Sequence, residues 1–331
     1  MRLGTWKTAI GGCFLAALLS VPLWGSTTEN RRTAMPGTLN YVEGEASIAD
    51  QRLDSQAVGN VELQNGQVLE TGKGKAEILL TPGVYLRVGS NSSVKMISNS
   101  LADTEVTVSQ GEAMVEVDEI YHENNLRVSQ PGGDTKLEKT GLYGFDASNA
   151  AVRVFDGKAV VTADDRKITV KKNQELAFDS PKLKARGFDK DQVTKTDDLY
   201  RWSSLRSEYL SEANVNAAQR YYVNGWYGPG WWGPGWYWDP GFGGFTFLPG
   251  SGYFYNPFGW GFYSPLMVRR APVVIGGGVR GFDGRRPVAL GNGFHNHAVR
   301  NFRGGYGGGF HGGGMRPGGG MGGFHGSGTH R

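Results

Sequence analysis

Hydrophobic and polar residues alternate with a period of two over much of the chain between positions 37 and 179. The alternation is clearest in five runs, at 77–80, 84–88, 105–108, 113–117 and 152–155. Successive side chains of a β-strand point to opposite faces, so these runs predict strands with one buried face. Glycine, asparagine and aspartate separate the runs, and helical periodicity is missing. Residues 37–179 are therefore predicted to form one all-β domain.

A short motif occurs three times, at residues 42–48, 109–115 and 155–161, as a glycine, a charged residue, an alanine and then an aliphatic residue two positions on. Glycine supplies the positive φ that a tight turn needs, so each copy predicts a hairpin. The unequal spacing excludes a regular repeat array. We expect one hairpin reused within the domain, or, as the alternative, glycine turns of the kind found in any β protein.

The pattern changes to steps of three and four residues within 180–222, after a polar linker. Five apolar positions fall on one helical stripe: Leu199, Trp202, Leu205, Tyr209 and Ala213. The stripe predicts an amphipathic helix that packs on the β domain, or alternatively binds a partner. Asp197 and Asp198 lie near its start, where negative charge is favourable against the helix dipole.

The C-terminal part of the chain departs from globular composition. Between positions 221 and 263, 19 of 43 residues are aromatic, and repeated Gly-Pro breaks exclude a helix. Residues 223–268 make up a Gly/Pro-rich aromatic segment. Residues 269–331 are runs of glycine, arginine and histidine that bury too little apolar surface to offset ordering entropy, so we predict a disordered tail.

The N-terminus has the pattern of an export signal. Arg2 and Lys7 precede an apolar run at 9–23, shorter than the roughly 20 residues of a membrane span. We predict a signal peptide at 1–25 and a periplasmic or outer-envelope location; an uncleaved anchor in the inner membrane is the alternative. Cys13 is the only cysteine and precedes most of the apolar run, unlike a lipoprotein cysteine. Cleavage before Ser26 would leave no thiol and exclude disulfides.

Charge is unevenly distributed along the chain. The net charge is only +4, yet from Arg269 onward there are nine arginines, no lysine and one acid, Asp283. The tail is therefore strongly basic and the preceding body acidic. This asymmetry predicts a tail that faces a polyanion, such as an anionic membrane or a lipopolysaccharide surface, or the acidic body itself.

Several features occur in a fixed order within the β segment. A Val-Glu-Gly-Glu-Ala run at 42–46 is followed by Thr71-Gly72, by Leu86-Arg87-Val88-Gly89, by a serine-rich bend and by Gly111-Glu112-Ala113. In this order they resemble the periplasmic domain of the FecR family. The resemblance implies an exported β domain, either solenoid-like or a jelly-roll sandwich, and both remain open.

The resemblance also implies a role in signalling. Regulators of the FecR family place a cytoplasmic anti-sigma segment before a transmembrane helix, and their periplasmic part receives a signal from an outer-membrane transducer. Only a few residues precede the apolar run here. We therefore expect no segment that could hold a sigma factor.

Catalytic motifs are absent from the sequence. There is no Gly-x-Ser-x-Gly, no phosphate loop and no His-Glu-x-x-His. The β segment has one histidine, His122, and its acidic residues fall mostly on alternate strand positions where solvation explains them. We predict a non-enzyme without catalytic residues, cofactor or metal site. His295 and His297 could chelate a metal weakly, although low-complexity composition explains them equally well.

Candidate contact residues lie in the C-terminal half: Trp226, Trp231, Trp232, Trp236, Arg300 and Arg303. The tryptophans suit sugar faces or a membrane interface, or alternatively pack on each other and on the β domain. The two arginines lie in an RGG-like stretch typical of nucleic-acid binding. Export argues against nucleic acid, so we expect these arginines to face an anionic envelope surface.

These observations give a leading hypothesis and two alternatives. The leading hypothesis is an exported, envelope-associated binding or scaffold protein whose β domain recognises a protein or glycan and whose tail tethers it to an anionic surface. The first alternative is a FecR-like signal-transduction component that acts through a partner membrane protein. The second is an RGG-type nucleic-acid binder.

Overall fold

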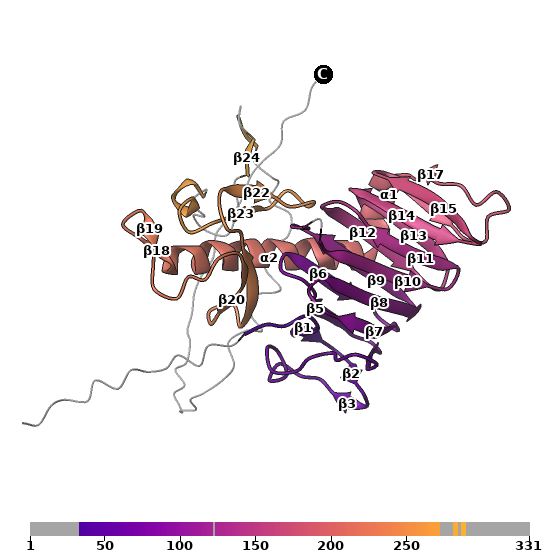
Figure 1. Ribbon diagram of the computed structural model, residues 1–331, viewed down its shortest axis with the longest axis horizontal. Helices are drawn as coiled ribbons and strands as arrows, with labels where there is room; N and C mark the ends of the chain where they lie inside the picture. Colours follow the sequence, from indigo (N-terminus) through magenta and orange to yellow (C-terminus); the bar gives the residue numbers. More distant parts are fainter. Residues whose placement is uncertain (1–32, 122, 272–280, 284–285, 289–331) are drawn as a thin grey trace, which may run out of the picture. The chain divides into compact units, whose positions relative to one another are not determined.

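The computed structural model describes residues 33–121, 123–271, 281–283 and 286–288 (Figure 1). The predicted signal peptide, His122, Arg300, Arg303 and the tail histidines lie outside these residues. The chain divides into two compact units, Met1–Ala271 and Pro272–Arg331. In the second unit, the described residues form one hairpin of β24 (Gly281–Asp283) and β25 (Arg286–Val288). All the other described elements belong to the first unit.

Two β-sheets form the body of the first unit. The first sheet has the order β1 (Leu39–Glu43), β5 (Lys75–Leu79), β6 (Val84–Val88), β9 (Glu112–Val117), β12 (Gly141–Asp146), β13 (Ala151–Asp156), β16 (Gln174–Ala177), β17 (Arg186–Gly187). The second has the order β15 (Arg166–Lys171), β14 (Lys158–Ala163), β11 (Gly133–Leu137), β10 (Asn125–Gln130), β8 (Asp103–Gln110), β7 (Ser93–Asn99), β4 (Val68–Thr71), β2 (Ala46–Ile48), β3 (Gln51–Arg52). These orders confirm the all-β prediction.

The sheets face each other across one apolar core. Alternate residues of both sheets supply it, among them Ile78, Leu86 and Val115 from the first sheet and Val106 and Val128 from the second. The strands pair antiparallel except β8 and β10, which are parallel. Runs of one to three successive strands alternate between the sheets while advancing along both, so the colour in Figure 1 changes gradually from β1 to β17. The fold combines the facing sheets of a sandwich with the stepwise advance of a solenoid.

The three glycine motifs mark crossings between the sheets, and the hairpin prediction is wrong. Gly44 joins β1 to β2, Gly111 joins β8 to β9 and Gly157 joins β13 to β14, and in each case the two strands belong to different sheets. All three glycines have positive φ, of 68°, 71° and 98°. A Cβ on Gly44 would lie 2.2 Å from the Lys73 carbonyl oxygen. The crossing at Gly44 therefore needs glycine, because the chain turns there in close contact with another backbone segment.

Two helices come after the sheets, α1 (Lys190–Thr196) and α2 (Asp198–Arg220). Asp197 caps α2, since its Oδ1 accepts a hydrogen bond from the Tyr200 backbone N–H at 2.8 Å. This cap satisfies a backbone donor that the first helical turn leaves free, and it adds a negative charge at the positive end of the helix. The start of α2 is as predicted, whereas α1 lies within the predicted polar linker, where one helix only was expected in 180–222.

The buried face of α2 holds only part of the predicted apolar stripe: Leu199 and Ala213 are buried, and Trp202 and Tyr209 are half-buried. Leu205 is 43% exposed, whereas the buried face holds Leu199, Ser203, Arg206, Ser207, Leu210, Ala213, Asn214, Ala217 and Ala218. Polar residues share this face because the sheet surface beneath it carries charged side chains, which Arg206 and Ser207 contact. The apolar pattern therefore identified part of the buried face and missed its polar residues, among them Arg206, Ser207 and Asn214.

The aromatic segment folds as short hairpins against α2 and the first sheet. They are β18 (Tyr222–Val223) with β19 (Trp226–Tyr227), β20 (Gly235–Asp239) with β21 (Gly244–Leu248), and β22 (Tyr253–Tyr255) with β23 (Gly261–Tyr263), before a 3-10 turn at Val268–Arg270. Figure 1 shows these hairpins around the C-terminal half of α2. Asn214 of α2 donates to the Phe247 carbonyl at 2.8 Å and accepts from the Tyr263 N–H at 2.8 Å.

Candidate functional site

A row of ionisable side chains lies on the outer face of the first sheet, opposite the apolar core. On β5, β6 and β9, the residues between the core positions point outward. Glu77 pairs directly across the strands with Arg87, and Tyr85 pairs with Glu116. Glu77, Arg87 and Glu116 are all fully buried. The sequence-based expectation that acids at alternate strand positions are solvated is wrong here, because α2 and the aromatic segment cover this face.

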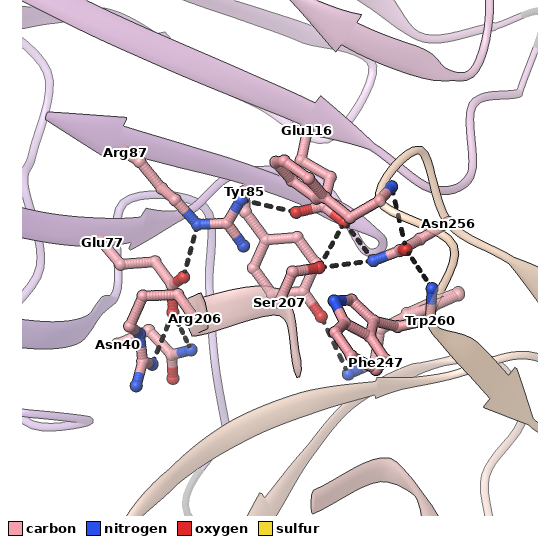
Figure 2. Close-up of polar contacts among 11 residues, drawn as sticks. Asn40, Glu77, Tyr85, Arg87, Glu116, Arg206, Ser207, Phe247, Asn256 and Trp260 are labelled. Carbon is pink, nitrogen blue, oxygen red and sulfur yellow. Dashed lines mark hydrogen bonds and ion pairs between the residues drawn. The ribbon is translucent and has the colours of Figure 1, made fainter. Parts of the chain in front are cut away.

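Arg87 and Arg206 neutralise the two glutamates (Figure 2). Arg87 donates from Nε to Glu77 Oε2 at 2.8 Å and from Nη1 to Glu116 Oε2 at 2.5 Å. Arg206 of α2 donates from Nη2 to Glu77 Oε1 at 2.9 Å. Its guanidinium also lies 4.0 Å from the ring centroid of Tyr41. Burying these four charges is tolerable because each contacts an opposite charge at hydrogen-bond distance.

The aromatic segment joins the network through Asn256. Its Nδ2 donates to Glu116 Oε1 at 2.6 Å, and Ser207 Oγ of α2 donates to the same oxygen at 2.8 Å. Asn256 Nδ2 also contacts Ser207 Oγ. The Asn256 Oδ1 accepts the backbone N–H of Trp260 at 2.9 Å, which fixes the loop that leads into β23 (Figure 2).

Asn40 on β1 makes the second junction with the aromatic segment. Its Nδ2 donates to Glu77 Oε1 at 2.9 Å and to the Phe245 carbonyl at 3.0 Å, and its Oδ1 accepts the Phe245 N–H at 2.7 Å. The side-chain amide thus pairs with the β21 backbone in both directions. Glu77 therefore contacts groups from three parts of the chain: β1, β6 and α2.

Electrostatics keep this network charged. Burial alone would raise the pKa of Glu77, but the Arg206 and Arg87 charges outweigh it and lower this pKa to about 2. Burial likewise opposes the charge of Arg87, yet Glu116 and Glu77 raise its pKa above the usual range. Neither group can exchange a proton near neutral pH. The four charged residues Glu77, Arg87, Glu116 and Arg206 form an ionic lock, a network that holds three segments of the chain together. This arrangement does not suit acid–base catalysis.

The four candidate tryptophans separate into two environments. Trp226 is 79% exposed and Trp232 is 48% exposed, whereas Trp236 is only 5% exposed. Trp231 stacks on Tyr227 with centroids 4.8 Å apart and an interplanar angle of 10°. Trp232 stacks on Tyr237 at 4.2 Å and 16°. Trp231 and Trp232 therefore belong to one stack through Tyr237, whereas Trp226 lies on β19 of the β18–β19 hairpin.

Trp236 occupies the core beneath the aromatic segment. Its ring packs edge-on against Tyr85 of β6 at 4.9 Å and near Phe247 at 5.9 Å. Because Trp236 is buried, it anchors the segment to the first sheet. Trp226, Trp231 and Trp232 remain candidates for contact with a ligand or surface. The composition of the sequence identified the aromatic segment. The sequence analysis did not identify the residues that hold this segment in place: Asn40, Glu77, Arg87, Glu116, Arg206 and Asn256.

Neither a metal cluster nor a membrane span occurs within the described ranges. No group of three or more His, Cys, Asp or Glu side chains among these residues is placed to hold a metal ion. In the same part of the chain, no helix has the length and apolar character needed to cross a membrane.

Comparison with known proteins identifies part of the first unit. Residues 67–160 match the family model described as FecR protein. The match runs from the residue before β4 into β14 and includes Glu77, Arg87 and Glu116; Arg206 and Asn256 lie outside it. The chain therefore contains a FecR domain, as its sequence features predicted. No curated protein matches the chain.

Two solved structures are similar, both of a candidate anti-sigma factor from Parabacteroides distasonis ATCC 8503. One shares 17% sequence identity at a TM-score of 0.33, covering 38% of this chain and 61% of that chain. The other shares 16% at a TM-score of 0.34, covering 38% and 62%. The chain thus spans less than two thirds of the length of either solved protein.

Proposed function

We propose that this chain, which contains a FecR domain, is a signal-transduction component of the bacterial envelope that acts by contact with a partner membrane protein and not by catalysis. The FecR match at residues 67–160 carries the proposal. Regulators with this domain pass signals through protein contacts, which requires no reacting group. A periplasmic location follows from the same proposal.

The structure supports this proposal through the ionic lock. Glu77 and Glu116 of the FecR domain contact Arg206, Ser207 and Asn256 from outside it. These bonds hold α2 and the aromatic segment against the domain, so a partner would meet one composite surface. Exposed aromatic side chains such as Trp226 and Trp232 lie on that surface, and aromatic residues are enriched where proteins bind each other.

A deletion strain complemented with variants tests the signalling role. Deletion should change the transcription of a small, defined set of genes, and the wild-type chain should restore it. A Trp226→Ala, Trp232→Ala double variant should fail to restore it and should lose a cross-link to one membrane protein. The matched control replaces Leu205 and Leu266, which are 43% and 39% exposed, by alanine. Unchanged transcription in the deletion strain would rule the signalling role out.

A second function is favoured by the stacked rings themselves. Tyr227, Trp231, Tyr237 and Trp232 stack in one row. Its end rings, Tyr227 and Trp232, are 36% and 48% exposed, and exposed aromatic rings offer flat faces of the kind that bind sugar rings. An envelope scaffold that binds a glycan would use these faces, with the basic tail on an anionic surface. Such a protein should co-sediment with cell-wall polysaccharide, and the double variant should not. Co-sedimentation without a transcriptional effect would favour the scaffold over the signalling role.

A further inference from the structure

A pocket of about 380 Å³ lies where the FecR domain meets the aromatic segment. The loop after β9 supplies Asp118, Glu119 and Tyr121 on one side, and the chain from Pro249 to Phe254 closes the other side, with Pro234 also lining it. Its volume falls within the range of pockets that hold small molecules. Because both parts line it, the pocket exists only when the aromatic segment is docked.

The acids of this pocket lack a basic partner in the described chain. Asp118 follows Glu116 by two residues, so it continues the outward-facing row of β9. Arg87 is engaged by Glu77 and Glu116, and Arg206 by Glu77. Among the described residues, no ion pair reaches Asp118 or Glu119. The buried row therefore contains three acids, Glu77, Glu116 and Asp118, but only two cations, Arg87 and Arg206. Glu119 is a further acid without a cation within the described part of the chain.

Hydrogen bonds do not compensate for the missing charge. Both oxygens of Asp118 and the Oε2 of Glu119 are buried and accept no hydrogen bond from a described donor. Asp118 is only 7% exposed. The Glu116 carboxyl disfavours its charge, and the nearby Arg87 charge, which favours it, is already paired with Glu77 and Glu116. Glu119 Oε1 accepts from the Tyr121 hydroxyl at 2.6 Å. A buried carboxylate without a donor is costly, so these oxygens are a strong site for a positive group.

The free site therefore disfavours the ionised form of Asp118. Burial, and then the Glu116 charge, raise the pKa of Asp118 well above its ordinary value. An arriving cation would reverse this balance and displace the proton. The Asp118 O–H bond would break, its electrons would remain on the carboxylate, the proton would pass to the buffer, and the cation would take its place.

The other residues that line the pocket can pack against the apolar part of an organic cation. Tyr121, Tyr253 and Phe254 present aromatic rings, and Pro249 adds an apolar edge. Aromatic faces attract ammonium and guanidinium groups, and they do so more strongly in desolvated sites. Acidic and aromatic groups together select a positive group over a neutral one of the same shape.

We propose that this pocket binds a small organic cation, an amidinium, guanidinium or primary ammonium group on a short apolar flank, with Asp118 and Glu119 as its counter-charges. Such binding is independent of the signalling role, because it depends on the charges of the pocket and not on the family match.

Isothermal titration of the purified full-length chain with benzamidine, and with neutral benzamide as the isosteric control, tests it. Benzamidine should bind at least roughly tenfold more tightly than benzamide, the effect of one charge-assisted contact. Its binding enthalpy should also depend on the ionisation enthalpy of the buffer, since a proton is released. Equal binding of the two probes, or no binding of benzamidine at millimolar concentration, would overturn the proposal.

Variants locate the site. Asp118→Asn should weaken benzamidine binding at least roughly tenfold and abolish the proton release. Glu119→Gln, at a half-buried position in the loop after β9, gives a second test if the first variant does not fold. Glu45→Gln is the matched control, because Glu45 lines a separate pocket of about 430 Å³ that already contains Arg52. Equal weakening by Glu45→Gln would show that benzamidine binds elsewhere.

Discussion

Arg206 Nη2 lies 2.9 Å from Glu77 Oε1, joining a helix to a strand 129 residues earlier in the chain. Both side chains are almost completely buried, at 5% and 0% exposure. Long-range ionic contacts of this kind gain little net stability over apolar packing, but they are costly to break and they fix one arrangement. Here the arrangement fixed is α2, and with it the aromatic segment, on the FecR domain.

Arg206→Ala should lower the free energy of unfolding by about 3 kcal/mol, the typical cost of breaking one side of a buried ion pair. The loss includes the contact of the guanidinium with Tyr41. Arg201→Ala on the same helix is the control, because Arg201 is 59% exposed and pairs only with exposed Asp198; it should cost less than about 0.5 kcal/mol. Urea unfolding measures both. Equal costs would mean that the network stabilises nothing.

Asn40→Ala should loosen β21 without unfolding the sheets. The substitution removes both hydrogen bonds to the Phe245 backbone and one to Glu77. We expect backbone amides of 244–248 to exchange with deuterium at least about tenfold faster, the effect of losing roughly 1.5 kcal/mol of local stability. Asn60→Ala, at an exposed position whose Nδ2 bonds only to the nearby Gln56 carbonyl, should leave this exchange unchanged. Unaltered exchange in Asn40→Ala would contradict the role given to Asn40.

Glu77→Gln should be most costly at neutral pH. The folded-state pKa is about 2, below the ordinary value of 4.5, so the folded protein binds fewer protons than the unfolded chain between these values. The stability that the Glu77 charge contributes to the folded protein is therefore complete above pH 4.5 and is lost as pH falls toward 2. We expect a loss of about 3 kcal/mol at pH 7 and a smaller one at pH 3. Chemical unfolding at both pH values checks this, with exposed Glu70→Gln as the control. If the loss of unfolding free energy does not depend on pH, the charge of Glu77 is not what stabilises the folded protein.

The fold class was predictable because it depends on local patterns. Period-two alternation in runs such as 84–88 identifies strands whatever they pair with, and the order of the motifs identifies the FecR domain. Asp197 before a helical stripe likewise marks the start of α2. Each of these signals is contained within a short stretch of chain.

The site was not predictable because it depends on contacts between distant segments. Glu77 alternates with core residues on β5, which is the pattern of an acid facing solvent. Only the helix that covers it, far along the chain, makes it buried. The same contact explains why α2 buries Arg206 and Ser207 among apolar residues: the charged surface beneath the helix needs polar partners. The pattern of one segment cannot show which face a later segment will cover.

The glycine corners give a prediction that separates crowding from backbone conformation. Gly44 and Gly66 both have positive φ, of 68° and 84°, so alanine is strained at either. A Cβ at Gly66 would meet nothing within 4 Å, but at Gly44 it would lie 2.2 Å from the Lys73 oxygen and 2.7 Å from the Gly74 Cα. Gly66→Ala should therefore cost only about 1 kcal/mol, the conformational part.

Gly44→Ala should cost about 3 kcal/mol or more, since the backbone between β4 and β5 must also move. The difference in unfolding free energy between the two variants, measured in urea, isolates the crowding at the crossing. If Gly44→Ala costs no more than Gly66→Ala, the close approach is not required, and the shared order of glycine, charged residue and alanine in the three motifs would need a reason other than the corner. A larger cost at Gly44 would establish that the motif encodes the step from one sheet to the other.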